Sequence, residues 1–347
     1  MRIVLDAMGS DNRPAPDVAG GVMAAREWGD EIILAGPEDA VRGELARHDT
    51  AGLAIEVLHA PEVIDMHEHT DAAKRKRDSS IRAGMRWVKE GRAEAFVSVG
   101  NTAAVLAAAL FDLGRIRVGT ARVRRPALAT IYPVAQTPVL LLDNGATADC
   151  RSEDLLQFAR MGAAYVEQVW GISNPRVGLV SNGEEADKGN MLVRETFGVL
   201  SESSLNFVGN VEPKEVTRGA ADVILADGFT GNVMLKTTEA IASFLFRYLR
   251  RELTGSTLNK LGLALMLPGL VVMLPGLLLL VPSLRRVARR LDYAEYGGAL
   301  LLGVEGIVII GHGRSNARAV KNAIGQARRA VESGVLDVVR GTLVQKA

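Results

Sequence analysis

The chain has 347 residues, and its 41 lysines and arginines almost balance its 40 aspartates and glutamates. A near-neutral net charge gives no global electrostatic reason to expect nucleic-acid binding. The single cysteine, Cys150, excludes an intramolecular disulfide framework and a cysteine-only metal site, which favours a reducing compartment. Because the first predicted strand follows Met1 without a signal-like apolar stretch, we expect a cytoplasmic protein.

Apolar strand-like segments alternate with helix-like segments along most of the chain. Strands are expected at residues 3–5, 32–35, 55–58, 95–99, 128–132, 139–142, 177–180, 206–208, 223–226 and 307–310. Because parallel neighbours are joined by crossovers of about a dozen residues, this alternation predicts an α/β/α sandwich with a mostly parallel sheet. No linker rich in proline, serine or charge divides it, so we expect one α/β catalytic domain over residues 1–347.

Small polar residues mark the expected starts of several helices. These starts are placed at Asp78 or Ser79, at Asn101 or Thr102, at Ser152 and at Ser315. Such side chains accept hydrogen bonds from the unpaired backbone amides of a first helical turn. A long helix is also expected over residues 229–253.

Six predicted strands end in short loops of Gly, Asn, Asp and Ser. The loops comprise residues 6–11, 99–102, 143–146, 181–185, 227–232 and 311–316. Ligands bind beyond the carboxyl ends of parallel strands, where glycine lets backbone amides approach an anion and each helix N-terminus adds about half a positive charge. We therefore expect these loops to gather in one site for a small anion.

The segment Leu261–Pro282 departs from this pattern because it contains no charged residue. As a helix it would cover the roughly 30 Å hydrocarbon core of a membrane. However, proline recurs every seven residues in this segment, and each internal proline costs a helix about 3 kcal/mol. A single crossing would also separate the strand at 307–310 from the rest of its sheet.

These observations predict a protruding helical hairpin over residues 247–292 whose apolar tip, residues 261–282, enters one leaflet. Basic residues flank the tip and suit an anionic lipid surface. They are Arg247, Arg250, Arg251 and Lys260 before it, and Arg285, Arg286, Arg289 and Arg290 after it. The alternative is a helical hairpin buried at a subunit interface.

Several familiar catalytic motifs are missing from the sequence. There is no phosphate-binding Gly-x-x-x-x-Gly-Lys loop, no Gly-x-Ser-x-Gly elbow, no Cys-x-x-Cys and no His-Glu-x-x-His. The segment 311–316 is a weak match to a dinucleotide-binding turn, since it ends in Asn and lacks a suitably placed acidic residue. His67-Glu68-His69 has no third ligand cluster nearby, so neither a metal nor another cofactor is expected.

Six motifs together carry a resemblance to a known family. They are Asp6-Ala7-Met8-Gly9, Lys76-Arg77-Asp78-Ser79-Ser80-Ile81, Gly183-Glu184-Glu185 with Lys188-Gly189-Asn190, Asp227-Gly228-Phe229-Thr230-Gly231-Asn232-Val233, Tyr296-Gly297-Gly298-Ala299, and His312-Gly313 with Ser315-Asn316. In this order, from Arg2 to about Ile324, the chain resembles the bacterial acyl-carrier-protein:phosphate acyltransferases that start phospholipid synthesis.

The resemblance implies that inorganic phosphate attacks the thioester of a long-chain acyl–acyl carrier protein, giving acyl phosphate and free carrier. A membrane glycerol-3-phosphate acyltransferase would take the acyl phosphate. The resemblance also implies a homodimer and a Rossmann-like fold similar to phosphotransacetylases and the isocitrate and isopropylmalate dehydrogenases. With the apolar tip, it predicts a cytoplasmic enzyme bound peripherally to the inner face of the cell membrane.

Lys188, Asn232 and His312 are the expected catalytic residues, and the resemblance decides their assignment. Lys188 would offset phosphate charge, Asn232 would donate to the oxyanion or phosphate, and His312 would protonate the thiolate. By residue type alone, a solvated lysine, a turn amide and a structural histidine are equally reasonable. Lys188 is a candidate partner of Glu184, and a helix cap is the default role of Asn101. Further phosphate-binding or substrate-binding candidates are Asp6, Gly9, Asn101, Thr102, Gly183, Glu184, Gly231, Gly313, Ser315 and Asn316.

Two basic clusters are candidate docking sites for the acidic carrier protein. One contains Lys74, Lys76 and Arg77, and the other contains Arg285 and Arg286. Basic patches would steer an acidic partner in a salt-dependent way, although a solvated loop is the ordinary interpretation of such a run. Two other functions remain open: an NAD-dependent decarboxylating dehydrogenase of related fold, and a membrane-associated scaffold without catalysis.

Overall fold

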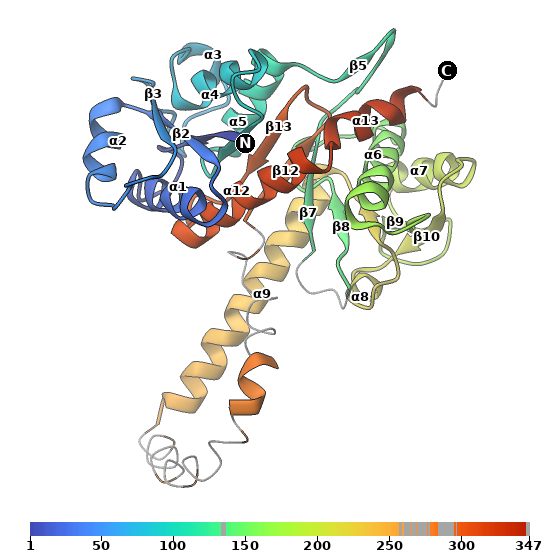
Figure 1. Ribbon diagram of the computed structural model, residues 1–347. Coiled ribbons are helices and arrows are strands. Elements are labelled where there is room, and N and C mark those ends of the chain that lie inside the picture. Colours follow the sequence, from blue (N-terminus) through green and yellow to red (C-terminus); the bar gives the residue numbers. More distant parts are fainter. Residues whose placement is uncertain are drawn as a thin grey trace.

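A computed structural model describes residues 1–132, 137–256, 259, 265, 269, 276, 278–283, 295 and 297–344. Within these residues an 11-stranded sheet runs through the body of the molecule, and helices cover both of its faces (Figure 1). The strand order is β10-β9-β11-β8-β7-β12-β13-β4-β1-β2-β3. Most neighbouring strands are parallel, which confirms the predicted α/β sheet.

Every expected strand is present, with slightly different ends. The strands of the main sheet are β1 (Arg2–Asp6), β2 (Glu31–Gly36), β3 (Ile55–His59), β4 (Ala95–Ser98), β7 (Ala127–Ile131), β8 (Leu140–Leu142), β9 (Val177–Val180), β10 (Phe207–Val211), β11 (Val223–Leu225), β12 (Ala299–Leu302) and β13 (Ile307–Ile310). Strand β12 and the separate hairpin of β5 (Arg117–Val118) and β6 (Ala121–Arg122) were not predicted from the sequence.

The helices begin close to the predicted caps. They are α1 (Ala15–Trp28), α2 (Glu38–Leu45), α3 (Ala72–Arg75), α4 (Ser80–Lys89), α5 (Thr102–Ala108) with a π-helical turn at Ala109–Leu113, α6 (Ser152–Trp170), α7 (Met191–Ser201), α8 (Pro213–Thr217), α9 (Gly228–Thr254), α12 (Ala317–Glu332) and α13 (Val335–Val344). Ser79 caps α4, whereas Asn316 rather than Ser315 caps α12, because its side chain accepts a hydrogen bond from the Ala319 amide.

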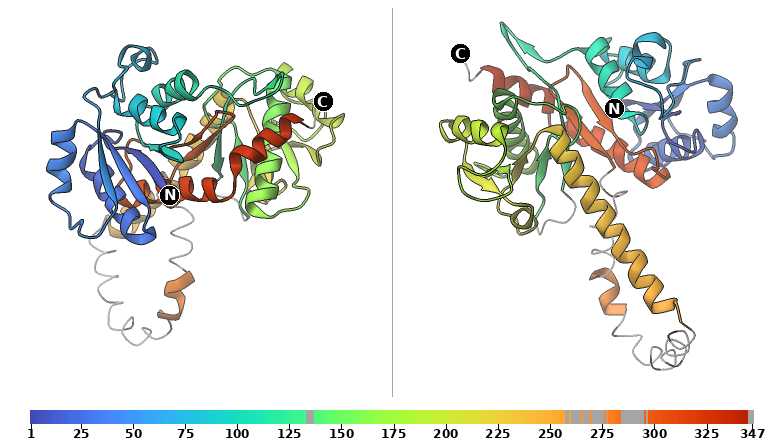
Figure 2. Two further views of the ribbon diagram at one scale, coloured as in Figure 1. Left: turned by 45° about the horizontal axis from the view of Figure 1, so that its top comes forward. Right: turned by 180° about the vertical axis from the view of Figure 1, so that it is seen from behind.

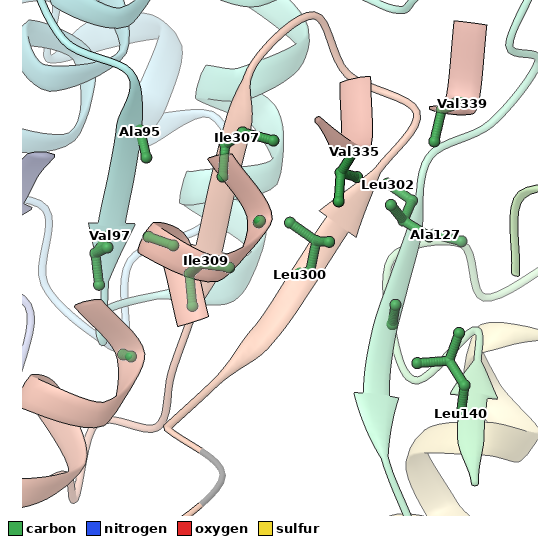
Figure 3. Close-up of a cluster of buried hydrophobic side chains, with 14 of the residues drawn as sticks. Ala95, Val97, Ala127, Leu140, Leu300, Leu302, Ile307, Ile309, Val335 and Val339 are labelled. Atoms are coloured by element: carbon green, nitrogen blue, oxygen red, sulfur yellow. The ribbon is translucent and has the colours of Figure 1, made fainter. Parts of the chain in front are cut away.

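Three consecutive antiparallel pairings around β12 and β7 reverse the strand direction of the sheet. It pairs antiparallel with β7 on one side and with β13 on the other, and β7 in turn is antiparallel to β8. Figure 3 shows β12 running against both neighbours. Strands β1 to β4 and β13 therefore point opposite to β8, β9, β10 and β11, so the two sets have their carboxyl ends at opposite edges of the sheet.

Both faces of the sheet are buried, which explains the nearly continuous apolar strands. Ile3 and Leu5 face a core shared with α1, α6, α12 and α13, whereas Val4 between them faces the helices α4 and α5 on the other side. Farther along that second face, Met234 and Leu235 of α9 pack against the β8–β11 half of the sheet. Figure 3 shows part of the first core, where Val335 and Val339 of α13 approach β7 and β12.

Helix α9 extends well beyond the sheet, as Figures 1 and 2 show. The helix expected over residues 229–253 is α9, and the chain re-enters the sheet at β12 and β13, whereas the hairpin expected over residues 247–292 stays a prediction. Most of the apolar tip at 261–282, together with Arg285 and Arg286, lies outside the described residues. In the part of the chain that the structure describes, no helix has the length and apolarity needed to span a membrane.

Glycines allow α1 and α12 to pack at close range. A Cβ atom on Gly20 of α1 would lie 2.5 Å from the Cβ of Val320 and 2.8 Å from the carbonyl oxygen of Ala317. Gly43, on the exposed side of α2, has no such neighbour within 4 Å among the residues that the structure describes. Alanine at Gly20 would therefore change both the packing of the two helices and the helix propensity, whereas alanine at Gly43 would change helix propensity alone.

We expect Gly20→Ala to destabilise the protein by about 1–3 kcal/mol, because the added methyl overpacks the contact between the two helices. The matched change Gly43→Ala should instead stabilise it by up to about 1 kcal/mol through helix propensity. Urea unfolding of both variants measures this difference. Equal effects of the two changes would contradict the close-packing explanation.

Candidate functional site

The six polar loops do not meet at one edge of the sheet, so that expectation was wrong. The loops after β1, β4 and β13 form a first loop group, comprising residues 6–11, 99–102 and 311–316. The loops after β8, β9 and β11 form a second loop group, comprising residues 143–147, 181–190 and 227–232. The three antiparallel pairings between β13 and β8 place the two groups at opposite edges.

Backbone contacts hold the first loop group together. A Cβ on Gly9 would lie 2.9 Å from the amide nitrogen of Gly100, so only glycine fits between these loops. The Asp11 amide donates to the Gly313 carbonyl at 2.8 Å, and a Cβ on Gly313 would meet the Asp11 carboxylate at 2.7 Å. The sequence predicted Gly9 and Gly313 as binding residues, and the structure shows both at close approaches between loops.

The polar side chains of this group mostly support the backbone. Asn101 accepts a hydrogen bond from the Ala104 amide, and its Nδ2 lies within 3.2 Å of three carbonyl oxygens in residues 65–68. The helix-cap interpretation of Asn101 is thereby confirmed. Thr102 is exposed at the first position of α5, Ser315 is buried, and the cap Asn316 is exposed.

Two carboxyl groups are buried beneath the first loop group. Asp6 accepts hydrogen bonds from the Ser98 hydroxyl at 2.7 Å and the Met8 amide at 3.1 Å, yet burial raises its pKa. Asp17 accepts the Ser10 hydroxyl at 2.5 Å, and burial raises the pKa of Asp17 to about 8. Among the described residues no group hydrogen-bonds to Asp17 Oδ1. Asp6 therefore supports the loop from within, and its burial does not suit direct contact with a phosphate.

Asp143 organises the second loop group. Its buried carboxylate accepts hydrogen bonds from the backbone amides of Leu128, Gly145, Ala146 and Thr147 at 2.6–3.1 Å. Burial raises the pKa of Asp143, while these four donors favour its charged form. The sequence analysis did not select Asp143, although an aspartate directly after a buried strand was a usable signal.

The N-terminus of α9 is fitted against the Asp143 loop. A Cβ on Gly231 would lie 2.0 Å from the Asp143 carbonyl oxygen, and one on Gly228 would lie 2.6 Å from the Thr147 carbonyl oxygen. These glycines let α9 begin in contact with the loop. Asn232 comes next and is half-buried, with its Nδ2 3.6 Å from the position that a Cβ on Gly145 would occupy.

Lys188 lies on the neighbouring loop after β9 and is exposed. Its side chain lies over Gly183, where a Cβ would approach the Lys188 Cγ to 2.8 Å. Glu184 forms an ion pair with Lys214 at 3.8 Å instead of with the expected Lys188. The reason is that residues 184–188 are not helical, so their four-residue spacing does not bring the two side chains together, whereas Lys214 of α8 lies within reach of Glu184.

Helix α9 links the two edges of the sheet. His312 of the first loop group lies 3.9 Å from the carboxylate of Glu239, which is seven residues after Asn232 on α9. Seven helical residues advance about 10 Å and return to nearly the same face. Asn232 and His312 therefore lie along one side of one helix, and His312 is exposed rather than buried.

Lys236 is the residue that sequence reasoning missed on this face. It lies four residues after Asn232 and three before Glu239, so all three share one helix face, and Lys236 is exposed. No carboxylate within the described ranges forms an ion pair with it. The signal was available in the sequence, because Lys236 follows Asn232 by four residues within the correctly predicted helix and therefore lies on the same helix face.

Of the docking candidates Lys74, Lys76 and Arg77, one already forms hydrogen bonds within the protein. Lys76 donates to Glu68 and to the Val63 carbonyl, both at 2.6 Å, which fixes it as a structural residue. Lys74 and Arg77 are exposed. The Glu68 carboxylate of the His67-Glu68-His69 segment is thus already engaged by the Lys76 ammonium group. Among the described residues there is no cluster of three potential metal ligands.

The family model described as "Fatty acid synthesis protein" matches residues 1–338 of this chain. The phosphate acyltransferase of Herpetosiphon aurantiacus is 47% identical over 99% of this chain and 98% of that protein. The phosphate acyltransferase of Trichlorobacter lovleyi is 44% identical over 96% and 92% of the respective chains. A match of this extent covers both loop groups and α9.

Solved structures with the same fold have much lower sequence identity. A phosphotransacetylase from Streptococcus pyogenes superposes with a TM-score of 0.56 at 17% identity, covering 96% of this chain and 94% of that one. A 4-hydroxythreonine-4-phosphate dehydrogenase from Klebsiella pneumoniae gives a TM-score of 0.51 at 12% identity, covering 95% and 99%. These likenesses confirm the predicted relation to phosphotransacetylase and dehydrogenase folds and show fold alone.

The raised pKa of Asp17 predicts a specific pH dependence of stability. The ordinary value is 3.8 and the folded value is about 8, so the folded state holds a proton that the unfolded chain releases. Stability should therefore fall as the pH rises from about 4 to about 8. Asp17→Asn removes this titration, and its stability relative to the parent should increase across that window in urea unfolding.

The exposed Asp39 provides the control, because Asp39→Asn should leave the pH dependence unchanged. A stability difference between Asp17→Asn and the parent that is constant from pH 5 to pH 9 would contradict a protonated Asp17.

Proposed function

Because this chain belongs to the phosphate acyltransferase family, we propose that it transfers a long-chain acyl group from acyl carrier protein to inorganic phosphate. A phosphate oxygen would attack the thioester carbon, and the carbon–sulfur bond would break. The products would be acyl phosphate and the carrier thiol, with a proton passing to the departing thiolate. This reaction would begin the supply of acyl groups for phospholipid synthesis, and a membrane glycerol-3-phosphate acyltransferase would consume the acyl phosphate.

The proposed chemistry requires positioning and charge stabilisation more than activation. Phosphate is already an anionic nucleophile near neutral pH, and a thiolate leaves readily, so the reaction needs neither a nucleophilic side chain nor a metal. The protein must hold phosphate near the carbonyl and stabilise the developing oxyanion. An amide side chain, lysine ammonium groups and glycine-rich backbone are suited to that role.

The face of α9 that carries Asn232, Lys236 and Glu239 is the observation that supports this proposal most directly. Asn232 lies against Gly145 in a loop that the Asp143 carboxylate holds through four hydrogen bonds. A donor on a rigid support loses little free energy to reorganisation when charge develops beside it. We assign the oxyanion contact to Asn232.

We assign the phosphate charge to Lys188 and Lys236. Lys188 lies on the loop after β9, which is the strand next to β11, and Lys236 lies one helical turn beyond Asn232. His312, at 3.9 Å from Glu239, would supply the proton for the thiolate. The thioester would lie at Asn232, and because His312 lies about two helical turns farther along α9, its proton would reach the thiolate through intervening water. The backbone amides of Gly183, Gly231, Gly313 and their neighbours would complete the binding surface.

A membrane-facing, dimeric enzyme fits the exposed apolar residues. Leu265, Leu278, Leu279 and Leu280 are each more than half exposed, as expected for a tip that enters the inner leaflet of the cell membrane. On α9, Ile241, Phe244, Leu245 and Tyr248 are also exposed at spacings of three and four residues, a pattern that fits a second copy of the chain. We propose that a homodimer in the cytoplasm binds the membrane peripherally through residues 261–282.

Activity is tested by phosphate-dependent release of carrier thiol from palmitoyl–acyl carrier protein, with the acyl product trapped by hydroxylamine. Equal amounts of thiol and hydroxamate, appearing only with phosphate, are expected. Lys188→Ala should cost about 2–4 kcal/mol of transition-state stabilisation, as the loss of an oxyanion donor does.

Lys214→Ala is the matched control, because Lys214 is exposed near the same loop but is paired with Glu212 and Glu184. It should retain nearly full activity. Thiol release that does not depend on phosphate would indicate a thioesterase. Activity of Lys188→Ala within a few-fold of the parent would remove Lys188 from the mechanism.

Membrane association is tested by flotation with liposomes that contain anionic lipid. Replacement of Leu278, Leu279 and Leu280 by serine should abolish flotation, because the three side chains would no longer transfer apolar surface into the leaflet. Val208→Ser, at an exposed apolar residue of the edge strand β10, is the control and should float like the parent. Unchanged flotation of the triple variant would favour the interface alternative for this segment.

A further inference from the structure

A strongly basic hairpin projects from the second edge of the sheet. Strands β5 and β6 form a two-stranded hairpin that stands out from the body beside α13 (Figures 1 and 2). Between Asp112 and Asp143 the sequence contains five arginines and no acidic residue. All five arginines lie in residues 115–125, here called the basic arm: Arg115, Arg117, Arg122, Arg124 and Arg125.

The base of the basic arm is firmly anchored. Ile116 and Val123 are completely buried in the core, and the Val123 amide donates to the Ile116 carbonyl at 3.0 Å. Arg124 donates to Asp154 at 2.9 Å, and Arg115 donates to the Arg124 carbonyl at 2.7 Å. Two of the five arginines therefore help to hold the arm in place.

The other three arginines have no comparable structural role. Arg117, Arg122 and Arg125 are exposed, and no carboxylate in the described part of the chain forms an ion pair with them. Arg117 and Arg122 are direct cross-strand partners. Like charges directly opposite each other destabilise a strand pair, and a hairpin of two strands is marginal by itself. An anionic partner that covers both guanidinium groups would relieve this repulsion.

The basic arm is connected to the loop that supports Asn232. The Thr147 hydroxyl donates to the carbonyl of Pro126, the residue directly after the arm, at 3.1 Å. The Thr147 amide donates to Asp143 at 2.6 Å. A protein docked on the arm would therefore lie at the edge that carries Asn232 and Lys188. Lys74 and Arg77, in contrast, precede α4 at the opposite edge.

We propose that the basic arm is the docking surface for the acidic acyl carrier protein, an inference that rests on the proposed function. Arginine guanidinium groups bind carboxylates with two parallel hydrogen bonds, which fixes orientation as well as attraction. The near-neutral net charge of the chain favours a local docking site for an acidic protein over nucleic-acid binding. Docking here brings the thioester to the second loop group.

The test uses the triple charge reversal Arg117→Glu, Arg122→Glu and Arg125→Glu in the full chain. At low salt, KM for palmitoyl–acyl carrier protein should rise by at least roughly tenfold, and the difference from the parent should shrink as salt increases. Turnover of a neutral substrate, the palmitoyl thioester of N-acetylcysteamine, should be unchanged. The matched reversal Lys74→Glu with Arg77→Glu compares the other basic cluster: an unchanged KM for the carrier substrate is expected, and a rise in KM confined to this variant would place docking there and overturn the inference.

An unchanged KM for the carrier substrate in the triple variant would overturn the inference, and so would an equal loss with the neutral thioester, since that would indicate a structural role. Fluorescence anisotropy of labelled carrier protein measures docking without turnover. A parent that binds the carrier through the arm but releases no thiol would refute the proposed function while leaving the docking surface in place. Tighter binding of a single-stranded RNA than of the carrier would overturn the docking proposal.

Discussion

The backbone ladder of β12 is the interaction on which the rest of this structure depends. Strand β12 pairs antiparallel with β7 on one side and β13 on the other, and β7 pairs antiparallel with β8, so these three pairings together join two sets of parallel strands that point in opposite directions. Both β12 and β13 follow the long excursion that begins with α9. The chain must therefore return from that excursion before the sheet is complete, which couples folding of the body to the protruding segment.

This construction also determines the shape of the candidate site. Because the polar loops lie at two edges, no single loop cluster can surround a substrate, and α9 connects them instead. Its first turn is held against the Asp143 loop through Gly228 and Gly231, and about three turns later Glu239 lies beside His312. A site about 10 Å long along one helix suits a reaction between a small anion and an extended thioester.

The net charge of the chain is close to zero, but the charged residues are distributed unevenly over the two edges of the sheet. The carboxyl groups of Asp6 and of Asp17 in α1 are buried beneath the first loop group, whereas the second edge carries the basic arm together with Lys188. These cations beside the second loop group would favour the approach of both phosphate and the proposed acidic carrier to the same edge. The buried carboxyls of the first group are shielded from solvent and contribute to stability and its pH dependence.

The sequence by itself determined the elements and their order, because strands buried on both faces are apolar runs and because Ser79 and Asn101 mark helix starts by local hydrogen bonding. It also selected Gly9, Gly231 and Asn232 through the family resemblance. Only the tertiary structure decided the reversal of strand direction between β13 and β8, the separation of the loops, the Glu184–Lys214 pair and the position of Lys236 between Asn232 and His312. The physical reason is that apolar periodicity reports burial along one segment, whereas strand direction and side-chain partners depend on contacts between residues far apart in the chain.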